Sequence, residues 1–85
     1  MAVLTLLSRA YCHLCEEMRD AVHPVAAEHG AAIVEVDVDA YPDLEAAYGE
    51  RVPLLMLGAP ADGVVLCEYR FDRTAVDTAL REPDA

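Results

Sequence analysis

Two cysteines separated by two residues stand near the start of the sequence, as Cys12-His13-Leu14-Cys15. At this spacing the two sulfur atoms can close a small disulfide with little backbone movement, or they can supply two ligands to a metal ion. The third cysteine, Cys67, is far away in the sequence. The pair therefore predicts either thiol–disulfide chemistry or half of a metal site.

The elements around the pair predict how the two cysteines differ. Residues 3–7 form a nearly unbroken apolar run, which is typical of a strand covered on both faces. From Cys12 to about Glu28 the apolar residues recur with helical spacing and share one face: Leu14, Met18, Ala21, Val22 and Val25. Cys15 lies at the edge of this face and Cys12 lies outside it. We therefore expect an exposed Cys12 and a half-buried Cys15.

Proline and glycine indicate where this helix ends, and an alternating pattern indicates the next strand. Pro24 is expected to kink the helix or to end it near Val22, because proline removes a backbone donor. Gly30 suits the closing turn. Residues 32–39 then alternate valine with acidic residues, which predicts a strand with one polar face or edge.

The second half of the sequence predicts four more segments. These are a helix over 42–48 that stops at Gly49, a strand over 54–57, a turn over 58–63 and a returning strand over 64–69. A short final helix follows, for which Thr74 and Asp72 compete as the N-cap. Residues 82–85 are expected to fray.

This order predicts an α/β fold of the form βαβαββα in a single domain, residues 1–85. The first two strands should be parallel, with a right-handed helical crossover, and the hairpin should add an antiparallel half. The result is a four-stranded mixed sheet with helices on both faces. A chain of 85 residues buries only about 60–65% of its unfolded surface, so the core is small.

The composition excludes several classes of partner. The sequence contains sixteen Asp and Glu residues but only six Arg, and it contains no lysine. Nucleic acids and anionic membranes select basic surfaces, so neither is an expected partner. The acids either form a solvated surface or select a basic partner. No basic region precedes the first apolar run, and no run approaches the roughly 20 residues that span a bilayer. We expect a cytoplasmic monomer.

Three cysteines with one close pair do not fit a secreted disulfide scaffold, which usually carries an even number. A tetrahedral zinc site needs four ligands, and no second CxxC or CxxH is present, so a redox pair is favoured. A metal or iron–sulfur module and an inert pair in an interaction domain remain alternatives. Cys67, on the returning strand, is expected to be a buried structural thiol, with a regulatory or intermolecular thiol as its alternative.

With these motifs in place, nearly the whole chain resembles the thioredoxin superfamily, and within it the small glutaredoxin-like proteins. Cys12-His13-Leu14-Cys15 follows the first strand and opens the first helix. Val52-Pro53 precedes the third strand, where the superfamily places a cis-proline facing the CxxC. Arg9 stands where glutaredoxins usually carry a lysine. The resemblance implies a thioredoxin/glutaredoxin fold and thiol–disulfide oxidoreductase activity.

The sequence also departs from the glutaredoxin pattern. Glutaredoxins usually carry Gly-Gly and an acid after the hairpin, where glutathione binds; here that stretch is Tyr69-Arg70-Phe71-Asp72. Arg51 replaces the usual threonine before Val-Pro, and residues 3–7 offer no counterpart to the buried acid of thioredoxins. These departures argue against a typical glutathione site, so no cofactor is expected, and the reductant is either glutathione or a thioredoxin-type protein.

The expected mechanism assigns different roles to the two cysteines. Backbone N–H groups at the helix start favour a thiolate on Cys12, whose pKa should lie below the free value of about 8.5. Cys12 attacks a protein or low-molecular-weight disulfide, and Cys15 resolves the mixed disulfide. Nearby charges oppose one another, since Arg9 and His13 favour the thiolate whereas Glu16 and Glu17 disfavour it. The predicted substrate contacts are Arg9, Tyr11, His13, Val52, Pro53 and Arg70, and no metal ligand is predicted.

Overall fold

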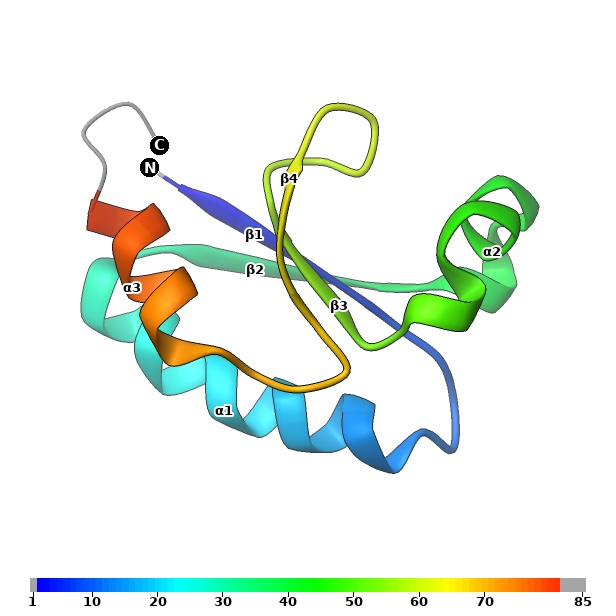
Figure 1. The fold of residues 1–85 in the computed structure, drawn as a ribbon, viewed down its shortest axis with the longest axis horizontal. Coiled ribbons are helices and arrows are strands. Elements are labelled where there is room, and N and C mark those ends of the chain that lie inside the picture. Colours follow the sequence, from blue (N-terminus) through cyan, green and yellow to red (C-terminus); the bar gives the residue numbers. More distant parts are fainter. Residues whose placement is uncertain (1, 82–85) are drawn as a thin grey trace.

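The computed structural model describes residues 2–81 of the chain (Figure 1). The elements follow the predicted order: β1 (Val3–Ser8), α1 (His13–His29), β2 (Ala32–Asp37), α2 (Pro42–Tyr48), β3 (Leu54–Leu57), β4 (Val64–Glu68) and α3 (Arg73–Arg81). Short 3-10 turns flank α2, at Val38–Ala40 and Gly49–Arg51. The predicted fraying of residues 82–85 lies outside the described residues.

The four strands form one mixed sheet in the order β2-β1-β3-β4. β1 pairs with β2 in parallel and with β3 in antiparallel, and β3 pairs with β4 in antiparallel. β1 is a central strand with both faces covered, which explains its continuous apolar sequence: Leu4 and Leu6 are buried in one core cluster and Leu7 in the other. The predicted four-stranded mixed sheet is confirmed.

Helices cover both faces of this sheet, as predicted. α1 and α3 lie on one face, where Met18, Val22 and Val76 pack against Leu6 and Leu55 of the strands (Figure 1). The shorter α2 lies at one end of the other face (Figure 1). There its apolar side chains pack on a smaller cluster of four buried residues: Leu7, Val38, Leu54 and Met56.

Pro24 does not end α1, which runs without interruption to His29. Pro24 lies on the exposed side of the helix, so the carbonyl that lacks its usual backbone donor faces solvent. The buried Val22, Val25 and Ala26 hold both sides of the proline onto the sheet. Gly30 ends the helix as predicted, with a φ of 65° that favours glycine.

Local side-chain hydrogen bonds correct one predicted boundary and decide between the two candidates at another. The strand predicted over 32–39 stops at Asp37, because its carboxylate accepts a 2.9 Å hydrogen bond from the N–H of Asp39 and starts a 3-10 turn. At the last helix, Asp72 rather than Thr74 provides the cap, since its carboxylate accepts a 3.1 Å hydrogen bond from the N–H of Ala75.

Candidate redox site

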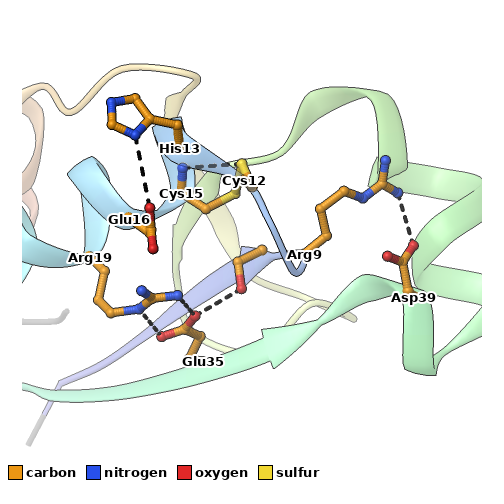
Figure 2. Close-up of a disulfide and its surroundings, with 9 residues drawn as sticks. Arg9, Cys12, His13, Cys15, Glu16, Arg19, Glu35 and Asp39 are labelled. Carbon is orange, nitrogen blue, oxygen red and sulfur yellow. Dashed lines mark hydrogen bonds and ion pairs between the residues drawn. A yellow bond between two sulfur atoms is a disulfide. The ribbon is translucent and has the colours of Figure 1, made fainter.

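Cys12 and Cys15 are joined in a disulfide at the start of α1, with their Cα atoms 5.2 Å apart (Figure 2). Cys12 is the N-cap of the helix and has an extended backbone conformation. Its Sγ accepts a 3.1 Å hydrogen bond from the backbone N–H of Cys15. The sulfur therefore occupies the place where a capping oxygen normally binds a free amide of the first turn, and this amide favours negative charge on it.

The two cysteines differ in exposure in the predicted direction. Cys15 is fully buried, because it lies on the face of α1 that packs on the sheet beside Met18 and Val22, whereas Cys12 is partly exposed. The predicted half-burial of Cys15 was therefore an underestimate. Leu14 was predicted to face the core, but its side chain is 40% exposed.

The Val52-Pro53 segment lies at the same end of the sheet as the disulfide. Leu7 pairs with Leu54 in antiparallel, so the loop that leads to Cys12 and the segment that precedes β3 leave the sheet at the same end. The Val52–Pro53 peptide bond is cis, and Pro53 is buried. Among residues 2–81, the backbone carbonyl of Val52 has no hydrogen-bond partner. This carbonyl is free to pair with another chain.

Arg9 is engaged away from the disulfide. Figure 2 shows its side chain running from the loop before Cys12 toward Asp39, with which it forms a 3.1 Å ion pair. A second acid, Glu45 of α2, lies 3.7 Å from the same guanidinium nitrogen. Arg9 thus ties the loop before Cys12 to α2, rather than presenting a free charge beside the sulfur.

The other predicted contact residues are distributed around the disulfide. His13 is 85% exposed and points away from the Cys12 sulfur (Figure 2). Its ring pairs with the acids of the next turn, at 3.1 Å from Glu17 and 3.9 Å from Glu16. Tyr11, next to Cys12, is fully exposed and has a φ of 59°, a conformation that L side chains rarely adopt. Arg70 is exposed and lies in the connection from β4 to α3.

A polar cluster behind the cysteines was not predicted from the sequence. Glu35 of β2 accepts a hydrogen bond from Arg19 of α1, at 2.7 Å from its Nε (Figure 2). It accepts another from the Ser8 hydroxyl, at 2.9 Å. The Arg19 hydrogen bond is the main reason that the pKa of Glu35 lies below its ordinary value, and the same pair raises the pKa of Arg19. The sequence held a signal for part of this cluster, because Arg19 is one helical turn beyond Cys15 and Ser8 ends the first strand.

Cys67 lies in the core rather than at the redox pair. Its side chain is 6% exposed, as predicted for a structural thiol, and burial raises its pKa. The sulfur accepts a 3.3 Å hydrogen bond from the N–H of Asp72, the residue that caps α3. Because a raised pKa leaves little thiolate, Cys67 is poorly suited to nucleophilic attack.

Comparison with known proteins identifies the family. The profile described as "Glutaredoxin-like domain (DUF836)" matches residues 3–81, which is nearly the whole chain. The chain belongs to this family.

Two solved structures of bacterial proteins match this glutaredoxin-like protein over most of both chains. The protein Ne2328 of Nitrosomonas europaea is 27% identical, covers 92% of this chain and 89% of its own, and has a TM-score of 0.78. The structural-genomics target XcR50 of X. campestris is 36% identical, covers 91% and 93%, and has a TM-score of 0.63. No curated protein matches the sequence.

Oxidised mitochondrial thioredoxin 3 of Saccharomyces cerevisiae shares the fold of the glutaredoxin-like chain. It is 17% identical, covers 94% of this chain and 76% of its own, and has a TM-score of 0.69. Within residues 2–81, no three His, Cys, Asp or Glu side chains are grouped closely enough to hold a metal ion. Over the same range, every helix is too short or too polar to cross a bilayer.

Proposed function

We propose that this glutaredoxin-like protein is a thiol–disulfide oxidoreductase in which Cys12 is the nucleophile and Cys15 is the resolving thiol. The observation that carries the proposal is the asymmetry of the pair. Cys12 caps α1, is partly exposed and accepts a backbone amide hydrogen bond, whereas Cys15 is buried behind it. Attack by an outer sulfur and resolution by an inner one suit this arrangement.

The proposed reaction starts from the reduced dithiol. The Cys12 thiolate attacks one sulfur of a substrate disulfide, forms a mixed disulfide and releases the other substrate sulfur as a thiolate. Cys15 then loses its proton and attacks Cys12 Sγ, which forms the Cys12–Cys15 disulfide and releases the second substrate sulfur. Two electrons pass to the substrate, whose two sulfurs take up protons. An external thiol, either glutathione or a thioredoxin-type dithiol, returns the pair to the reduced state.

In this proposal the substrate peptide binds to the backbone of the segment that precedes Pro53. The unpartnered C=O of Val52 can accept a hydrogen bond from an extended peptide beside Cys12. This hydrogen bond would hold the substrate disulfide near the sulfur that attacks it. We propose a monomeric cytoplasmic protein whose substrate is a protein or low-molecular-weight disulfide.

Trapping the mixed disulfide tests this function. The Cys15→Ser variant is mixed with cell lysate, and adducts are separated without reductant and identified by mass spectrometry. We expect disulfide adducts through Cys12 that dithiothreitol releases. The double variant Cys15→Ser/Cys67→Ser is the matched control, because Cys67 is buried, and it should give the same adducts. Reduction of wild-type protein by the glutathione and thioredoxin systems, assayed in parallel, identifies the reductant.

Two results would contradict the proposal. Adducts that form through Cys15 in a Cys12→Ser variant, and not through Cys12, would reverse the assigned roles. Stoichiometric zinc or iron in freshly purified protein, measured by metal analysis and visible absorption, would favour a metal-carrying module instead.

A further inference from the structure

A groove of about 310 Å³ opens beside the disulfide, between the first turns of α1 and the connection from β4 to α3. We call it the Phe71 groove. Its apolar walls come from five residues: Leu14, Met18 and Ala21 of α1, and Tyr69 and Phe71 of the connection. Leu14 lies between the two cysteines in the sequence, and the N–H of Tyr69 donates a 2.8 Å hydrogen bond to the carbonyl of Pro53. The groove therefore adjoins both parts of the proposed redox site.

Tyr69 holds a backbone conformation that favours glycine. Its φ is 65°, and this conformation costs an L residue about 1 kcal/mol or more. Glycine would avoid this cost. Instead the position carries a large aromatic side chain, 45% exposed, whose hydroxyl donates a 2.6 Å hydrogen bond to the carbonyl of Glu50. The side chain is thereby fixed as one wall of the groove, where it narrows the space that a ligand would enter.

The charges at the groove do not favour an anion. Glu17 and Arg70 both line it and contribute opposite signs. The two other arginines predicted near the site are neutralised, Arg9 by Asp39 and Arg51 by Glu68. Only Arg70, which has no ion-pair partner within residues 2–81, is available, and the whole chain carries a net charge of −10. A small anionic thiol such as glutathione would find one free cation and an apolar wall.

The length of the groove suits a side chain on an extended peptide. In an extended segment, side chains two residues apart point to the same face and lie about 6.6 Å apart. The groove runs along α1 from Leu14 to Ala21, a rise of about 10 Å. When a substrate cysteine meets Cys12, the side chain two residues away can therefore reach the apolar walls.

We propose that the Phe71 groove gives the protein a preference for protein disulfides over small anionic ones, because it receives an uncharged apolar side chain two residues from the reacting cysteine. This inference rests on the proposed thiol–disulfide exchange and names the class of substrate for it.

Matched peptide disulfides test the groove. Two symmetric disulfide dimers are made, one from Leu-Gly-Cys-Gly-Leu and one from Ser-Gly-Cys-Gly-Ser, with blocked ends. Each oxidises reduced wild-type protein in single-turnover stopped-flow experiments, so that no reductant needs to be known. We expect the leucine dimer to react about tenfold faster at low concentration, which corresponds to about 1.4 kcal/mol. Glutathione disulfide should react more slowly than the leucine dimer.

Two helix variants locate the effect. Ala21→Met adds a side chain inside the groove and should reduce the preference for leucine over serine to less than about threefold. Ala27→Met makes the same change at an exposed position of α1 away from the groove, and it should keep the tenfold preference. Because the preference is a ratio within each variant, a general loss of stability or reactivity does not imitate it.

The outcomes separate the two proposals. Equal rates for the leucine and serine dimers in the wild type, an unchanged preference in Ala21→Met, or a faster reaction with glutathione disulfide would each overturn the groove inference. In those cases, oxidation of the dithiol by the small neutral bis(2-hydroxyethyl) disulfide would still support the proposed function. If no disulfide oxidises the reduced pair, the proposed function fails and the inference fails with it.

Discussion

The two sides of the Cys12–Cys15 disulfide use their charged residues differently. On one side, which we call the anchored side, Arg9 pairs with Asp39 and Arg19 pairs with Glu35, so each arginine joins two elements of the fold. On the other side lies the Phe71 groove, where Arg70 makes no ion pair within residues 2–81 and five of the seven lining residues are apolar or aromatic. The anchored side holds the cysteines in place, whereas the groove side is open to a substrate.

This contrast separates residues that position the site from residues that meet a ligand. A basic residue near a cysteine pair invites interpretation as an anion contact, but the charge of Arg9 is already paired with Asp39. Mutations on the two sides should therefore give different phenotypes: loss of stability on the anchored side, and changed substrate preference on the groove side.

The largest effect on activity is expected when the attacking sulfur itself is removed. Cys12→Ser should lower the single-turnover reduction of bis(2-hydroxyethyl) disulfide by the reduced protein to the uncatalysed rate, because no other sulfur is placed to attack. Cys67→Ser should change the rate by less than about twofold, since its thiol is buried and its raised pKa disfavours the thiolate. Substantial activity in Cys12→Ser would show that another group carries the reaction.

An intermediate effect is expected on the anchored side. Glu35→Gln removes the charge that accepts the Arg19 and Ser8 hydrogen bonds, and it should lower the free energy of unfolding by about 1 kcal/mol at pH 7. The leucine preference of the groove should not change. Glu28→Gln, which breaks a more exposed pair with Arg73, is the matched control and should cost less. Urea unfolding measures both losses.

The pH dependence of the stability lost in Glu35→Gln follows from the direction in which the pKa of Glu35 is shifted. The pKa of Glu35 in the folded protein lies below its ordinary value of 4.5, mainly because of the Arg19 hydrogen bond. The stabilisation is therefore fully present above the unfolded pKa and disappears as the pH falls through the folded pKa. The difference between wild type and Glu35→Gln should be constant above about pH 6 and should shrink in more acidic solution. A difference that stays the same in acid would mean that the carboxylate charge is not its source.

The smallest effect is expected for Arg9 as a ligand contact. Arg9→Gln should change the ratio of rates with glutathione disulfide and bis(2-hydroxyethyl) disulfide by less than about twofold, because Asp39 already neutralises this arginine. Arg70→Gln is the comparison on the groove side and should lower the same ratio by about two- to threefold, since its charge is not paired. A larger effect for Arg9 than for Arg70 would reverse the comparison of the two sides.

The sequence predicted the fold well because its patterns are local and strong. The apolar run of β1, the helical spacing of α1 and the hairpin signals are each set by neighbouring residues, and the short connections leave few ways to assemble them. The unequal burial of Cys12 and Cys15 followed from the same helical spacing. Pro24 was misjudged because a proline on the exposed side of a packed helix is tolerated, and the same helical spacing places Pro24 outside the apolar face.

The surroundings of the disulfide were harder to predict because they depend on contacts between distant residues. The alternating pattern of β2 placed Glu35 on a polar face, yet this face is turned toward α1, where Arg19 and Ser8 satisfy the carboxylate. The partner of Arg9 is thirty residues away and belongs to a turn that was predicted as strand. The Phe71 groove arises only when the β4–α3 connection lies beside α1.

The most direct test of the central claim is to identify which cysteine of the reduced protein reacts first with an alkylating agent. The reduced wild-type protein is treated at pH 7 with one equivalent of iodoacetamide, digested and analysed by mass spectrometry. Our account predicts that the label is on Cys12, with Cys15 and Cys67 largely unmodified because both are buried. A label mainly on Cys15 or Cys67 would contradict it.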